Sequence, residues 1–246
     1  MLIRATTEQN GKIGEGTMSP KLFSYCIPYD DGAAPNPFWG RCTLAICKPR
    51  IRGAAKKDDW VVGTGSVNSP IGDISGMVVY AMRVTKKMTM KEYDQFTQSE
   101  FPDKIPVMNS ADRRRRYGDS IYNFSTPTPS LRPSVHDEGN RSTDLSGRFV
   151  LLSDHFFYFG DQPVDLPEAL LGIVKQGRGH RSDKNAEYVD DFVDWIESLK
   201  SKYPLAEPIG NPQWWSKQNV QASCDPCATG RQQEAEADLA EPDVPC

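Results

Sequence analysis

Apolar and β-branched residues gather in short runs along the first third of the chain, and Gly, Pro or Asp separates one run from the next. This pattern is typical of strands, because such side chains suit a pleated surface and the separating residues form turns. It predicts strands at 22–27, 43–47, 60–63 and 77–84, with one or two more within 148–160. The short spacing favours a mainly antiparallel sheet or a small barrel.

Helical patterns follow the strands. Thr89 precedes Glu92 by three residues, which is the spacing of a capping box and predicts a short helix after it. A second helix is expected at 167–177, with Pro in its first turn and Gly at its end. The third and clearest is expected at 185–202, where apolar residues recur at helical spacing.

These elements predict one α+β domain at 18–221, formed by a small mixed or antiparallel β-barrel with peripheral helices. We expect a flexible extension at 1–17 and a disordered tail at 222–246, because the tail is acidic and poor in apolar residues. The segment at about 102–145 is rich in Pro, Ser, Arg and Asp. A long segment of this kind is either a functional loop or disordered.

Composition indicates an ordinary globular protein of 246 residues with a formal net charge of −4. No run of about 18 apolar residues occurs, and the amino terminus lacks the apolar centre of a signal peptide. We therefore expect a cytoplasmic protein without membrane association. Six acidic residues lie in the last 24, so the rest of the chain is nearly neutral and its basic clusters suggest local anion sites.

The cysteines are interpreted as buried thiols. Strand alternation sends Cys42 and Cys47 to opposite faces, and no set of His or Cys follows at metal-ligand spacing. We therefore predict no metal ion and no cofactor. No Ser lies in a Gly-x-Ser-x-Gly turn and no Cys is visibly paired with a His, so the sequence indicates no nucleophile.

A phosphate site is predicted after the strand at 43–47. Lys48, Arg50 and Arg52 share one edge if the backbone stays extended, and guanidinium groups bind phosphate oxygens in pairs. Thr64 and Ser66 stand in a Gly-Thr-Gly-Ser run that lets an anion approach backbone and hydroxyl donors. A solvated basic surface and a plain turn explain the same residues without a ligand.

Aromatic residues supply candidates for stacking on a nucleobase. Tyr158 lies in the run that follows Asp154 and His155, and Trp39 lies in a Pro- and Gly-rich loop. Asp154 and His155 are also candidates for an acid and a base. The alternative is that the aromatic run is buried in the core on both faces of a strand.

The GRGHR turn at 177–181 adds two more candidates. Arg178 can hold phosphate, and His180 can carry a proton near neutral pH. The cationic end of a helix explains this turn equally well.

Four blocks together resemble a known family: YCIPYDDGAAPNPFWGRCTLAICKPRIR, DDWVVGTGS, DHFFYFG and GRGHR. They are similar to the bacterial and phage proteins called nucleotide modification associated domain 2, over roughly residues 21–200. The resemblance implies a link with systems that make or handle modified nucleotides. A looser likeness to PUA-like domains, including the ASCH and EVE families, implies a small barrel with a nucleobase in a cleft beside it.

Three function hypotheses stay open. The first is binding of a modified nucleotide or base, free or in nucleic acid, with Lys48, Arg50 and Arg52 on phosphate. The second is a nucleotide transferase or hydrolase for the same substrates. The third is an assembly module that docks a partner through the helix at 185–202 and the pair Trp214 and Trp215. The sequence does not indicate an oligomeric state.

Overall fold

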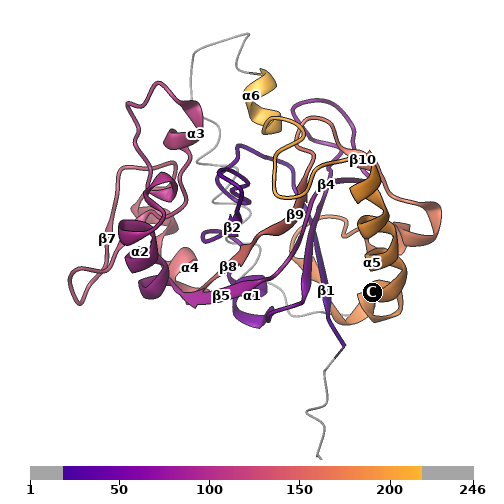
Figure 1. Ribbon diagram of the computed structural model, residues 1–246, viewed down its shortest axis with the longest axis horizontal. Coiled ribbons are helices and arrows are strands. Elements are labelled where there is room, and N and C mark those ends of the chain that lie inside the picture. Colours follow the sequence, from indigo (N-terminus) through magenta and orange to yellow (C-terminus); the bar gives the residue numbers. More distant parts are fainter. Residues whose placement is uncertain (1–18, 218–246) are drawn as a thin grey trace, which may run out of the picture.

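The computed structural model describes residues 19–217 as a mixed α+β arrangement (Figure 1). The extension expected at 1–17 and the acidic tail expected at 222–246 lie outside the described residues. None of the described helices is both long enough and apolar enough to cross a membrane.

The largest sheet has six strands and supplies most of the scaffold. Its order is β10-β4-β3-β1-β11, and β9 also pairs with β4. Only β1 and β3 run parallel; the other pairs are antiparallel. The strands are β1 (Leu22–Cys26), β3 (Trp60–Thr64), β4 (Met77–Arg83), β9 (His155–Tyr158), β10 (Val164–Asp165) and β11 (His180–Arg181).

A second sheet has the order β2-β8-β5, with strands β2 (Cys42–Leu44), β8 (Phe149–Ser153) and β5 (Lys86–Thr89). A two-stranded ribbon is formed by β6 (Tyr122–Asn123) and β7 (Ser130–Leu131). Because β2 pairs with β8 and not with β1, the described strands form separate sheets. No closed barrel is found among them, so the predicted PUA-like barrel is not confirmed.

The six α-helices of the described chain are α1 (Pro49–Ala54), α2 (Met90–Ser99), α3 (Arg113–Arg116), α4 (Arg141–Ser146), α5 (Val189–Ser198) and α6 (Gln213–Lys217). The capping box predicted from Thr89 and Glu92 is present at α2. The helix expected at 185–202 is α5 flanked by 3₁₀ turns at Asp183–Tyr188 and Leu199–Ser201. The helix expected at 167–177 is instead a 3₁₀ helix, Glu168–Ile173.

The hydrophobic core lies on both faces of the large sheet. On one face α5 covers the strands (Figure 1), and the ring of Phe192 meets that of Trp60 edge to face with centroids 5.9 Å apart. On the other face residues of β1 and β4 pack with Cys42, Leu44 and Leu151 of the second sheet. The two sheets therefore share one core, although no described strand of one sheet pairs with a strand of the other. Ser153 of β8 links them, because its hydroxyl donates to the Arg83 carbonyl of β4 at 2.6 Å.

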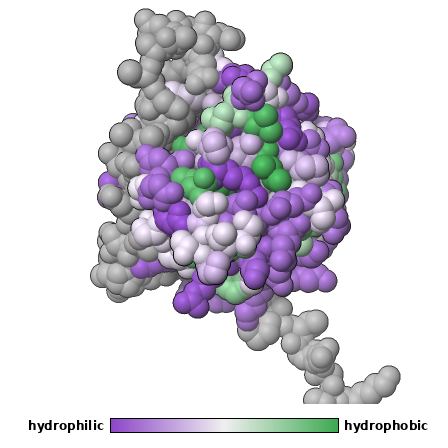
Figure 2. All heavy atoms as spheres, turned by 90° about the vertical axis from the view of Figure 1, so that its left-hand side faces the viewer, coloured by the Kyte–Doolittle hydropathy of each residue, from purple (hydrophilic) through white to green (hydrophobic). Residues whose placement is uncertain are grey.

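The segment at 102–145 is packed onto the second sheet, so the disordered alternative is wrong. Ile121 and Tyr122 belong to one buried cluster with Val150 and Leu152 of β8. Figure 2 shows the side of the molecule that carries α2, α3 and β7, which is mostly hydrophilic with a few hydrophobic patches. The polar composition that suggested a loop is thus the solvent side of a folded segment.

Candidate functional site

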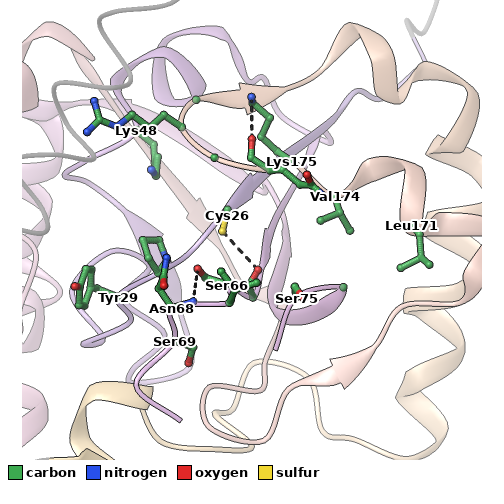
Figure 3. A pocket seen from close by; sticks show the side chains of 18 residues that line it. Cys26, Tyr29, Lys48, Ser66, Asn68, Ser69, Ser75, Leu171, Val174 and Lys175 are labelled. Carbon is green, nitrogen blue, oxygen red and sulfur yellow. Dashed lines mark hydrogen bonds between the residues drawn. The ribbon is translucent and has the colours of Figure 1, made fainter. Parts of the chain in front are cut away.

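A cavity of about 1030 Å³ opens where the parallel strands β1 and β3 end. Its lining comes from the residues just after β1, from the turn at 65–69 after β3, and from the segment 174–179 that leads into β11. The carboxyl ends of neighbouring parallel strands are a common ligand position, because the chain diverges there and leaves a crevice. Figure 3 shows Lys48 and Lys175 on one side of this cavity and Ser66, Asn68 and Ser69 on the other.

Positive charge dominates the cavity. Lys48, Lys175 and Arg178 line it, and no Asp or Glu is found among its described lining residues. Cations grouped in a concave surface without acidic neighbours raise the local potential and attract anions. The geometry therefore favours an anionic ligand.

The cavity also has an apolar rim. Val67 and Leu171 line it with 62% and 46% of their surface exposed. They are two of the three large hydrophobic residues exposed in the described part of the chain. Apolar side chains in the lining of a cavity suit contact with the apolar part of an organic ligand.

Backbone geometry directs Lys48 into the cavity. Cys47 and Lys48 have left-handed φ angles of 56° and 41°, and α1 begins at Pro49. The buried Lys48 places Nζ 4.8 Å from the ring centroid of Tyr25. Lys48, Arg50 and Arg52 were expected to share one edge if the backbone stayed extended. The backbone instead enters α1 at Pro49, so the three side chains do not share an edge.

Arg52 is inside the protein and does not line the cavity. Its guanidinium donates to three backbone carbonyls: Nε to Cys47 at 2.7 Å, Nη1 to Phe149 at 2.7 Å and Nη2 to Asp144 at 2.5 Å. These carbonyls belong to segments about a hundred residues apart in the chain. Arg52 was predicted to bind phosphate, but its guanidinium links segments inside the protein. Arg50 is exposed on α1 and also lies outside the cavity lining.

The Gly-Thr-Gly-Ser run forms the opposite wall. Ser66 Oγ accepts a hydrogen bond from the Asn68 backbone N–H at 3.1 Å, and both residues line the cavity. Thr64 is buried outside the lining and donates to the Tyr25 carbonyl at 3.3 Å. Gly65 is required, because a Cβ there would lie 2.3 Å from the Ile74 carbonyl oxygen.

The two residues predicted to stack on a base do not line this cavity. Tyr158 is fully buried, and its hydroxyl donates to Asp30 Oδ2 at 2.6 Å. Burial raises the pKa of Tyr158 well above its usual value, and it raises the pKa of Asp30 to about 6. Trp39 packs on Phe38 with ring centroids 5.5 Å apart.

The predicted acid and base residues are also elsewhere. His155 Nε2 lies 2.5 Å from Glu197 Oε1 of α5. Burial lowers the pKa of His155, although the hydrogen bond to Glu197 opposes this shift. Asp154 is exposed in the turn between β8 and β9, and His180 pairs with Tyr25 at the sheet edge. The structure does not bring these three residues together.

A second group of polar side chains lies beside the cavity residue Lys48. Cys47 Sγ is 3.7 Å from His136 Nε2, and His136 Nδ1 is 2.6 Å from Asp144 Oδ2. All three residues are buried. Burial lowers the pKa of His136, but the Cys47 charge and the Asp144 hydrogen bond outweigh it and raise the pKa to about 10.

No local pattern in the sequence connects the members of this group. His136 and Asp144 both lie in the segment expected to be irregular, and 89 residues separate His136 from Cys47. The sequence offered one indication: His136, one of only three His residues, lies in the segment 102–145 that was a candidate functional loop, eight residues before Asp144. The prediction that no Cys pairs with a His is wrong.

The residues of the assembly hypothesis contact their own chain. Trp215 Nε1 donates to the Asp31 carbonyl at 2.9 Å, and its ring stacks on Phe38 with centroids 5.5 Å apart. Trp214 is buried. The apolar face of α5 packs on the sheet through Phe192 and Ile196.

Comparison with known proteins gives one match. The family model described as nucleotide modification associated domain 2 matches residues 19–219. No curated protein and no solved structure matches the chain.

Proposed function

The chain belongs to the nucleotide modification associated domain 2 family, and from this premise we propose that it binds a modified nucleotide, free or in nucleic acid, in the cavity at the ends of β1 and β3. The observation that carries the proposal is the lining itself: three cations, no described acidic residue and an apolar rim. A nucleotide has the matching parts, since its phosphate is anionic and its base offers an apolar face.

Different residues of the lining contact different parts of the ligand. Lys48 and Arg178 hold the phosphate, because charge-assisted hydrogen bonds to phosphate are roughly twice as strong as neutral ones. The hydroxyl of Ser66 adds a donor from the opposite wall. Val67 and Leu171 contact the base or its modification from the rim.

Position favours Lys48 as the main phosphate ligand. It is buried while Arg178 is exposed, so water screens its charge less. Its approach to the ring of Tyr25 also limits the side-chain freedom that binding would otherwise remove.

Titration calorimetry against normal and modified nucleotides and short oligonucleotides tests the proposal. We expect Lys48→Met and Arg178→Gln each to weaken binding about tenfold, from the loss of one charged hydrogen bond of roughly 1.5 kcal/mol. The control is Arg50→Gln, which removes an exposed cation next to the site that does not line the cavity. Absence of binding at millimolar ligand, or equal weakening by the control, contradicts the proposal.

A further inference from the structure

We propose that Cys47, His136 and Asp144 form a nucleophilic triad in which the Cys47 thiolate attacks an acyl carbon. The inference does not rest on nucleotide binding and names an activity that the cavity alone does not supply. It stands on the distances, the backbone and the buried brace around these three residues.

The three side chains have the order of a nucleophile, a base and a group that orients the base. Cys47 Sγ faces His136 Nε2 at 3.7 Å, and His136 Nδ1 faces Asp144 Oδ2 at 2.6 Å. A nucleophile is activated by a base within reach when a third group fixes the ring of that base. The sulfur distance lies within the looser range expected without substrate.

Asp144 fixes the relative position of the other two residues. Its Oδ1 accepts the Cys47 backbone N–H at 3.0 Å, while Oδ2 accepts His136 and also the Tyr122 hydroxyl at 3.1 Å. Arg52 adds a second link, because it donates to the carbonyls of both Cys47 and Asp144. Asp144 and Arg52 therefore hold Cys47 and His136 in fixed positions relative to each other.

The backbone at the nucleophile is strained. Cys47 and Lys48 both have positive φ angles, although neither is Gly. A side chain with a Cβ occupies this region at a cost, and such residues concentrate at functional sites. The two residues stand between β2 and α1, so the sharp turn presents Cys47 to His136 and Lys48 to the cavity.

The same three residues are less suited to a metal ion. Both ring nitrogens of His136 already face protein atoms, and Asp144 is engaged by His136, Tyr122 and the backbone of Cys47. The ligand atoms of the three residues lie within 4.8 Å of one another, and three is the number of protein ligands that a catalytic zinc site has. Cys47 and Asp144, however, face different ring nitrogens of His136, which is the arrangement of a nucleophile, a base and a residue that orients the base.

The proposed step balances without a redox partner. The Sγ lone pair forms a bond to the acyl carbon, and the bond to the leaving group breaks with its electron pair. The leaving group takes the proton from His136 Nε2. Water then attacks the thioester and gives a proton to His136, the C–S bond pair returns to Sγ, and a carboxylic acid leaves.

Two probes test the triad in the full-length protein. Iodoacetamide at about pH 6 should alkylate Cys47 at least about tenfold faster than Cys26 of the same molecule, because a paired thiolate persists below the ordinary thiol pKa. p-Nitrophenyl acetate should release one equivalent of p-nitrophenolate in a burst and leave an acetyl group on Cys47. Peptide mass spectrometry identifies the modified residue in both cases.

Variants show whether Cys47 reacts because of His136 and Asp144 or only because its thiol is accessible. His136→Gln and Asp144→Asn should slow alkylation of Cys47 at about pH 6, with the rate recovering in alkali. The groups that face His136 are Cys47 and Asp144, with Tyr122 and Arg52 around the carboxyl group. Cys26→Ser is the control, because it removes a thiol that lines the cavity and leaves the triad intact.

Three results would overturn the inference. The first is alkylation of Cys47 only after unfolding, which needs no variant to observe. The second is an unchanged rate in a folded His136→Gln protein, shown by a parental circular dichroism spectrum. The third is one zinc ion per purified chain that is lost in the His136→Gln variant. Failure of these tests leaves nucleotide affinity at the cavity unaffected, so the two proposals can fail separately.

Discussion

Substituting Arg52 by Met tests whether this residue braces the fold, as the structure shows, or binds phosphate, as its sequence context suggests. Met has a similar length and no charge. The variant removes three hydrogen bonds from a charged donor to the carbonyls of Cys47, Phe149 and Asp144. These bonds link α1, which carries Arg52, to Asp144 of α4 and Phe149 of β8, so the substitution weakens contacts between segments that are distant in the chain.

The magnitude follows from these contacts. A hydrogen bond to a charged group contributes about 1.5–3 kcal/mol, and a buried carbonyl left without its donor carries a desolvation penalty. Part of the loss is offset because no buried charge remains. We expect the free energy of unfolding to fall by about 3–5 kcal/mol, which for a chain of this size lowers Tm by roughly 10 °C.

Urea unfolding followed by circular dichroism measures the change. Arg52→Lys should lower the free energy of unfolding somewhat less than Arg52→Met does. An ammonium group keeps the charge but does not reproduce the planar guanidinium with its several N–H donors. Arg50→Met is the matched control two residues away on the exposed side of α1 and should change stability by less than about 0.5 kcal/mol. A loss below about 1 kcal/mol for Arg52→Met, or a loss of nucleotide affinity without a loss of stability, would refute the reasoning.

Three further predictions concern stability. Burial raises the pKa of Asp30 to about 6, so the ionised carboxylate lowers the free energy of unfolding. This loss is absent near pH 4 and reaches about 3 kcal/mol once the pH rises above 6. In urea titrations, Asp30→Asn should therefore gain stability relative to the parent as the pH is raised from about 4 to 7. Gly63→Ala should destabilise the protein by about 2–4 kcal/mol in thermal unfolding, because the new Cβ would lie 2.6 Å from Tyr80 Cε1; an unchanged Tm would contradict this. Thr89→Ala should cost about 1 kcal/mol in the same assay through loss of the capping box with Glu92, and a neutral effect would mean that α2 does not need its cap.

Part of the candidate site was accessible from the sequence. Lys48, Ser66 and Arg178 were predicted as anion ligands, and the structure places all three in the lining of one cavity. The reasoning used residue type and local Gly-rich turns, which are properties of short segments. It did not predict that Lys175 joins them, because nothing local connects this residue to the turn after β3.

Sequence alone determined the elements whose signal is local. Strands β1, β3 and β4 follow from runs of apolar and β-branched residues, and the start of α2 follows from its capping box. The apolar stripe of α5 likewise predicted the face that meets the sheet. Each of these depends on a period or on a spacing of a few residues, which a single segment carries by itself.

Only the tertiary structure decided how distant segments combine. It turned the backbone at Cys47 into α1, directed Arg52 inward, and folded the polar segment 102–145 onto β8. It thereby brought His136 to Cys47 across 89 residues of chain. The physical reason is that burial and hydrogen-bond satisfaction are settled by the whole packed molecule, and one strand or turn contains no record of the partner that will reach it.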